Sequence, residues 1–133
     1  MRNPFLRAPG LVLLLTAGLV LQPVAARSDP NPRPNLPEFL VPGQAVTRPV
    51  WKEILFSYEG QAGEVITISV TSKTPGLDPR LALLDPEKKE EASDDDSGGH
   101  GDSLLKNHAL QKSGRYTVSV QGDEGKVEVL LTK

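Results

Sequence analysis

From about residue 40 onward, apolar and polar residues alternate along the chain, and no helical period persists over a long stretch. A period of two is typical of β-strands that bury one face. We therefore predict strands over residues 50–58, 65–71, 80–85, 103–110, 115–120 and 126–131. The residues expected to point inward from three of these strands are Ile54, Phe56, Tyr58, Ile66, Ile68, Val70, Tyr116, Val118 and Val120.

Glycine, proline and aspartate residues separate these segments at intervals of about ten residues. Gly60 and Gly63 bracket one turn, and Lys112-Ser113-Gly114 is typical of another. Gly122-Asp123-Glu124-Gly125 is predicted to be a hairpin turn between the last two strands. Short strands at this spacing predict an all-β fold of antiparallel strands, either a sandwich or a barrel.

The first 26 residues have the three-part layout of a secretory signal peptide. Arg2 and Arg7 give a positive start, residues 11–21 are apolar, and small side chains lead up to Ala26. The apolar stretch of 11 residues is much shorter than the roughly 20 that a membrane-spanning helix needs. We therefore expect cleavage near Ala26, a secreted or periplasmic product, and no membrane span after cleavage.

Residues 27–39 are predicted to be a proline-rich linker, and residues 40–133 a single domain. Prolines recur at every second or third position of the linker, which prevents a helix and favours an extended chain. We expect a monomer, because the charged Lys126 and Glu128 on the last predicted strand oppose pairing between strand edges.

Composition excludes several classes of protein. The chain has 133 residues, 15 Lys and Arg against 17 Asp and Glu, and no cysteine. A disulfide scaffold, a thiolate metal site and a cysteine nucleophile are therefore excluded. A formal net charge of −2 gives no electrostatic reason to expect a nucleic-acid partner.

The most unusual chemistry lies in residues 85–102, which we call the acidic segment because it holds eight acidic residues and only two lysines. Three consecutive aspartates repel one another unless they are fully solvated or share a cation. The glycine-rich residues 97–101 allow the chain to turn back toward these aspartates. Carboxylates on a flexible loop are the hard oxygen ligands that calcium prefers.

The possible calcium ligands are Asp78, Asp94, Asp95, Asp96 and Asp102. An EF-hand is excluded, because the twelfth position counted from Asp94 is Leu105 where that loop needs a glutamate. The alternative interpretation is a solvated acidic loop without a metal, since runs of like charge usually are that.

Catalytic interpretations have little support. Ser97, His100 and Ser103 lie close to several aspartates in sequence, but within a glycine-rich loop that does not fix a Ser-His-Asp geometry. His108 lies on a predicted strand and is interpreted, like His100, as an ordinary polar residue. We therefore predict that the protein is not an enzyme.

Trp51 falls on the face opposite Ile54 and Phe56. It is therefore expected to be exposed, where it either stacks on a sugar ring or a partner surface or covers an edge of the sandwich.

Five segments in this order resemble bacterial pre-peptidase C-terminal domains. They are residues 60–72 (GQAGEVITISVTS), 77–86 (LDPRLALLDP), 94–97 (DDDS), 102–103 (DS) and 113–120 (SGRYTVSV). The resemblance covers about residues 43–133. The chain differs from the family after Asp85-Pro86, where the usual glycine is absent, and in its linker, where only Asp29 and Glu38 are acidic.

The resemblance implies a β-sandwich of jelly-roll type, and with the strand pattern it predicts about seven to eight antiparallel strands. Such domains usually accompany the catalytic domain of secreted proteases, and some bind calcium and a polymeric substrate. The sequence therefore predicts a secreted, non-catalytic accessory module, stabilised by calcium, that binds a polymeric or cell-surface ligand or an exported protein. The alternative is a structural domain that assists the folding or solubility of another exported protein.

Overall fold

A computed structural model describes residues 37–133, and the predicted signal peptide and residues 27–36 of the linker lie outside this range. The described chain is all-β, as predicted, and forms seven strands. They are β1 Glu38–Phe39, β2 Val46–Gly60, β3 Val65–Ser72, β4 Arg80–Leu84, β5 Glu90–Asp94, β6 Ser103–Ala109 and β7 Gly114–Thr132. Within residues 37–133 we find no helix of a kind that could span a membrane.

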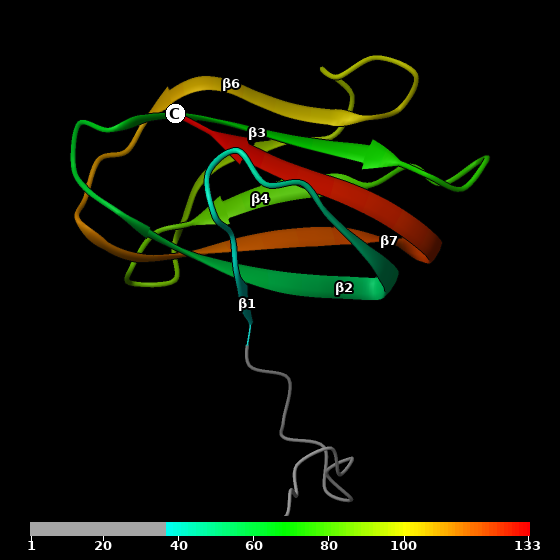
Figure 1. Ribbon diagram of the computed structural model, residues 1–133, viewed down its shortest axis with the longest axis horizontal. Coiled ribbons are helices and arrows are strands. Elements are labelled where there is room, and N and C mark those ends of the chain that lie inside the picture. The colour runs from blue at the N-terminus through cyan, green and yellow to red at the C-terminus, as the bar shows by residue number, and fades with distance from the viewer. Residues whose placement is uncertain (1–36) are drawn as a thin grey trace, which may run out of the picture. The chain divides into compact units, whose positions relative to one another are not determined.

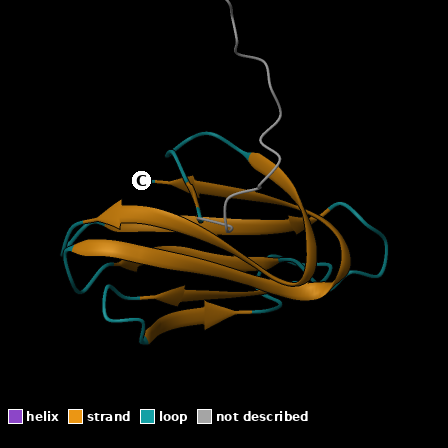
Figure 2. Cartoon of the chain, turned by 90° about the horizontal axis from the view of Figure 1, so that it is seen from below, coloured by secondary structure: helices purple, strands orange, loops and turns teal. Residues whose placement is uncertain are grey.

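The two longest strands, β2 and β7, pair with each other antiparallel along nearly their whole length (Figure 1). The first half of β7 also pairs with β4, and its second half pairs with β3. Both long strands bend midway, so one hydrogen-bonded sheet folds over into the two layers of a β-sandwich (Figure 2). One layer has the order β5-β4-β7-β2-β1 and the other the order β6-β3-β7-β2.

The core lies between the two layers, and the predicted inward faces are confirmed. Phe56, Ile68, Val70, Tyr116 and Val118 are all completely buried. The last strand contributes a further alternating set, Val127, Val129 and Leu131, which is also buried. Burial of a large apolar side chain is worth about 1.5–3 kcal/mol, so these alternating faces supply the main stabilisation of the fold.

The predicted hairpin turn at residues 122–125 is wrong, because these residues lie within the continuous strand β7. Neither Gly122 nor Gly125 has the positive φ that tight hairpin turns require. A Cβ on Gly125 would lie 2.9 Å from Leu77 Cδ2 and 3.0 Å from Thr74 Cβ. The glycines therefore allow the loop between β3 and β4 to pack closely against the bend in β7.

Two further differences concern the edges of the sandwich. The acidic segment is not one continuous loop, because Glu90–Asp94 forms the edge strand β5, which pairs with β4. The predicted antiparallel arrangement holds for every described pair except β1 with β2, which is parallel. β1 includes Glu38 and Phe39, the last two residues of the predicted linker.

Candidate functional site

Trp51 lies at the bend of β2 and is 71% exposed, as its position in the alternating pattern predicted. The pairing with β7 shifts register here, since Val50 opposes Gly125 and Lys52 opposes Gly122. β7 therefore carries one extra residue opposite Trp51, which is a β-bulge. Bulges increase the local twist and redirect side chains, and this one accompanies an indole that points away from the core.

Two hollows meet at Trp51. The larger has a volume of about 780 Å³, and its lining includes Pro49, Trp51, Thr74 and Lys126. The smaller has a volume of about 480 Å³ and lies on the side of Asp78, Arg80 and Gln121. Trp51 and Glu124 line both hollows. We call Trp51 and the residues lining these two hollows the Trp51 surface.

The charged side chains of the Trp51 surface are equal in number for the two signs. Its acidic residues are Asp78, Asp123 and Glu124, and its basic residues are Lys52, Arg80 and Lys126. The Lys52 ammonium lies 5.1 Å from the centre of the Trp51 ring, within the range of a cation–π contact.

Asp94, a predicted calcium ligand, contacts the backbone at the end of β5. Its Oδ2 atom accepts hydrogen bonds from the N–H groups of Ser97 at 2.9 Å and Leu104 at 2.8 Å. The Ser97 hydroxyl donates to its other oxygen. Burial alone would raise the pKa of Asp94, but these hydrogen bonds from Ser97 and Leu104 hold the pKa below its usual value.

The other predicted ligands lie around the same turn. Asp102 accepts a hydrogen bond of 2.9 Å from the N–H of Ser72, so it connects the turn to the end of β3. The carboxylates of Asp95, Asp78 and Asp94 raise the pKa of Asp96 through charge repulsion. Asp78, on the loop between β3 and β4, therefore lies close enough to Asp96 for its charge to act on it, and its role as a calcium ligand stays a prediction.

Carboxylate oxygens suit calcium chemically, but calcium needs roughly six to eight oxygen ligands that converge on one point. Within residues 37–133, no group of three or more acidic, histidine or cysteine side chains is arranged to hold a metal ion. Asp94 and Asp102 instead hold backbone N–H groups in this geometry. Calcium binding therefore stays a prediction.

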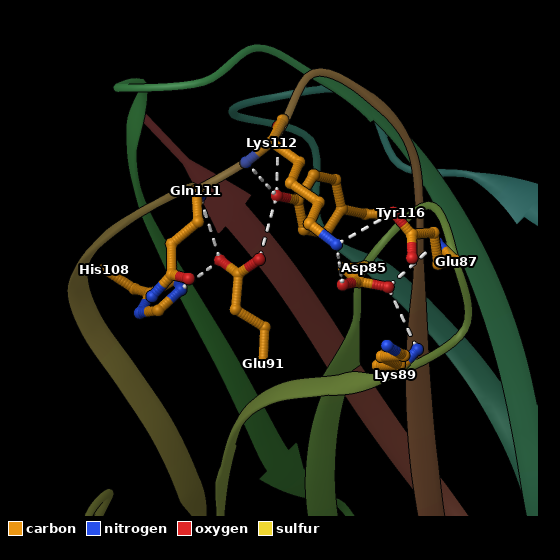
Figure 3. A network of polar contacts seen from close by, with 8 residues as sticks. All are labelled: Asp85, Glu87, Lys89, Glu91, His108, Gln111, Lys112 and Tyr116. Atoms are coloured by element: carbon orange, nitrogen blue, oxygen red, sulfur yellow. Dashed lines mark hydrogen bonds and ion pairs between the residues drawn. The ribbon is translucent and has the colours of Figure 1, made fainter.

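The first part of the acidic segment belongs to a polar network at another edge of the sandwich (Figure 3). The Glu91 side chain is only 5% exposed, and its Oε1 atom lies 2.8 Å from His108 Nε2. Its Oε2 atom accepts a hydrogen bond of 3.0 Å from the Tyr116 hydroxyl. His108, which the sequence left without a partner, thus joins edge strand β6 to edge strand β5.

Asp85 and Lys112 form the second half of this network (Figure 3). The Lys112 ammonium lies 3.0 Å from Asp85 Oδ2 and 3.0 Å from Glu87 Oε2. The N–H of Lys89 donates to Asp85, and together with Lys112 it holds the pKa of Asp85 below its usual value despite burial. This network fixes the turn between β4 and β5, a role that the sequence did not predict.

The side chains considered for catalysis have separate structural surroundings. The Ser103 hydroxyl is buried and donates a hydrogen bond of 2.6 Å to the carbonyl oxygen of Pro79. Ser97 donates to Asp94, while His100 lines a hollow beside the loop of residues 72–77.

No protein-family model matches the chain, and no curated protein matches it. Among solved structures, it is similar to the pre-peptidase C-terminal domain of a collagenase from Bacillus anthracis. The two are 16% identical over 77% of this chain and 100% of that one, with a TM-score of 0.59.

Two periplasmic inhibitors of g-type lysozyme are more distant in structure. PliG from Aeromonas hydrophila has a TM-score of 0.43 at 16% identity, over 73% of this chain and 98% of that one. PliG from Salmonella Typhimurium has a TM-score of 0.41 at 12% identity, over 74% of this chain and 100% of that one. The resemblance to pre-peptidase C-terminal domains that the sequence indicated is therefore confirmed at the level of the fold.

Proposed function

We propose that the protein is an exported, non-catalytic binding module whose ligand contacts the Trp51 surface. The observation that carries this proposal is the position of Trp51, which is 71% exposed and lines two hollows. The likeness in fold to a domain of a collagenase supports an accessory role, because that domain is one part of a larger enzyme. The ligand is a polymer, a cell-surface component or another exported protein.

Physical chemistry supports this position as a binding site. A tryptophan side chain offers a large apolar area, and leaving it in water forgoes the free energy that its burial would release. Binding interfaces concentrate their energy in a few residues, among which tryptophan, tyrosine and arginine are enriched. Trp51 stands between the two hollows, and Arg80 lines the smaller one, so the surface combines two of these residue types.

Retention on insoluble material tests the proposal. The full chain, expressed with its own N-terminal segment in a secreting host, is mixed with cell-wall sacculi, cellulose, chitin and insoluble collagen. We expect retention on at least one of these materials, and we expect Trp51→Ala to reduce the retained fraction strongly without lowering Tm.

Val65→Ala is the matched control for this experiment. Val65 is 48% exposed and lies at the start of β3, away from the residues that line the two hollows. Its replacement removes exposed apolar area elsewhere on the domain and should leave retention unchanged. Equal retention of wild-type protein and Trp51→Ala on every material would contradict the proposal.

Calcium is a second, separate part of the proposal. Calcium bound by carboxylates of the turn that follows β5 would neutralise the repulsion that raises the pKa of Asp96. The exposed side chains of Asp78, Asp95 and Asp96 would have to move together to bind it, because they do not form a ready-made group in this geometry. Thermal unfolding with calcium and with excess chelator tests this part.

A further inference from the structure

We propose that the ligand of the Trp51 surface is a neutral polysaccharide strand that lies across the indole and occupies both hollows. This inference rests on the proposed function and names the chemical class of the ligand. It follows from the shape of the surface, from its charge and from the blocked edge of the neighbouring strand.

The shape favours an elongated ligand. Trp51 and Glu124 are shared by the two hollows, which therefore form one surface on both sides of the indole. A compact small molecule would fill one hollow and would cover only one side of Trp51 and Glu124. A linear polymer that crosses Trp51 would contact both hollows with successive units.

The charge and the side-chain types favour an uncharged, hydroxyl-rich ligand. The surface holds three acidic and three basic side chains, so it offers no net attraction to a polyanion or a polycation. Asp78, Arg80 and Gln121 carry planar polar groups. Arg80 also pairs with Glu90 at 3.1 Å and Gln121 donates to Glu53 at 3.1 Å, so these two side chains are held in place while their remaining N–H and C=O groups can exchange hydrogen bonds with ligand hydroxyls. The Lys52 ammonium lies over one face of the indole, and the opposite face is the flat apolar area that would match the C–H face of a pyranose ring.

The adjacent strand edge disfavours an extended peptide. A peptide that adds to a sheet needs a regular row of N–H and C=O groups. Within residues 37–133, the first half of β2 pairs with β7 on one side and has no strand on its other side, because β1 pairs only with Phe56 and Ser57. Pro49 lacks an N–H there, and the bulge beside Trp51 interrupts the ladder.

Fluorescence tests the inference, because Trp51 is the only tryptophan of the chain. The full chain is titrated with hexasaccharides of β-1,4-linked glucose, β-1,4-linked N-acetylglucosamine and β-1,3-linked glucose, and with the corresponding monosaccharides. We expect one hexasaccharide to shift the emission to shorter wavelength in a saturable way. It should bind about tenfold or more tightly than its monosaccharide, because several units contact the two hollows.

Two variants make the test specific. Glu124→Ala keeps the fluorophore and should weaken hexasaccharide binding by about threefold or more, since Glu124 lines both hollows. Trp51→Ala, measured by calorimetry, should weaken it about tenfold or more. Unchanged Tm values for both variants establish that the fold is intact.

The outcomes separate this inference from the proposed function. Saturable binding of a neutral hexasaccharide that depends on Trp51 supports both. Retention on collagen that depends on Trp51, without any response to the hexasaccharides, overturns the polysaccharide class and leaves the binding module standing. Polysaccharide binding that survives Trp51→Ala overturns both the site and the inference.

Discussion

The carboxylate of Asp94 at the end of β5 accepts a hydrogen bond of 2.8 Å from the backbone N–H of Leu104 on β6. β5 and β6 are the outer strands of the two different layers and do not pair with each other. A side chain therefore joins the layers at this edge of the sandwich, where no backbone ladder does so.

Replacing Asp94 should weaken this connection. Asp94→Ala leaves the N–H groups of Ser97 and Leu104 without their carboxylate partner. We expect a loss of about 1–3 kcal/mol in the free energy of unfolding, measured by urea denaturation. Asp95→Ala is the matched control, because Asp95 is exposed and adjacent, and it should change stability by less than about 0.5 kcal/mol.

The pH dependence has a definite sign. Because the folded state holds the pKa of Asp94 below its usual value of 3.8, this contribution is complete above that value and is lost as the pH falls through the folded pKa. Wild-type protein and Asp94→Ala should therefore converge in stability in strong acid. A difference that stayed constant down to the acid transition would contradict the role given to the Asp94 carboxylate.

Calcium should stabilise the domain if the turn after β5 binds it. At about a hundred times its dissociation constant, an ion bound only by the folded state adds about 2.7 kcal/mol. Each kcal/mol raises Tm by about 4–8 °C in a domain of this size, so we expect a rise of about 10–20 °C in millimolar calcium, reversed by chelator.

The variant Asp95→Asn/Asp96→Asn is the informative one for calcium, because both side chains are exposed. It should abolish the calcium response while keeping the Asp94 hydrogen bonds. Because neighbouring carboxylates raise the pKa of Asp96, its charge opposes folding at neutral pH, and the variant should have a slightly higher Tm without calcium. No shift of the wild-type Tm would mean that the acidic side chains are simply solvated.

Gly125 should tolerate no side chain. In Gly125→Ala, the new Cβ would lie 2.9 Å from Leu77 Cδ2 and 3.0 Å from Thr74 Cβ, so the loop has to move away from β7. We expect a loss of about 1–3 kcal/mol, measured by urea denaturation. Asp123→Ala on the same strand is exposed and should cost less than about 0.5 kcal/mol. Equal effects of the two changes would contradict the close packing.

Both tyrosines of the chain should ionise late in an alkaline titration. Burial, together with the hydrogen bond that its hydroxyl donates to Glu64, raises the pKa of Tyr58 to about 12. Burial also raises the pKa of Tyr116. The stabilisation tied to these raised values is complete below pH 10 and is lost as the pH rises through the folded pKa. Ultraviolet absorbance should show little tyrosinate near pH 10, and ordinary ionisation there would contradict the buried hydroxyls.

Much of the fold could be predicted from the sequence, because its strands bury one face and so alternate strictly. Examples are the buried residues Ile66, Ile68 and Val70. The same alternation predicted that Trp51 is exposed. The strand β5 escaped prediction because an edge strand with one neighbour needs few apolar residues, and Ala92 is its only apolar one. A turn and a strand are both compatible with the residues Gly122-Asp123-Glu124-Gly125. Only the packing of these glycines against Leu77, which is distant in sequence, favours the strand.

The candidate site was less accessible to sequence analysis. The exposure of Trp51 follows from alternation, but its hollows are formed by residues 49–52, 74–80 and 121–126, which come together only in the folded chain. A metal site was predicted from the number of aspartates in the acidic segment. Their hydrogen bonds to Leu104 and Ser72 depend on how β5, β6 and β3 meet, which no local pattern encodes.

The central claim is that ligand binding depends on Trp51. Its most direct test is the ratio of dissociation constants of wild-type protein and Trp51→Ala for the material that retains the wild type best, measured alongside Tm. We predict that Trp51→Ala binds about tenfold or more weakly at an unchanged Tm, as for a central aromatic contact. Equal affinity of the two proteins would show that the ligand binds elsewhere and would contradict the account.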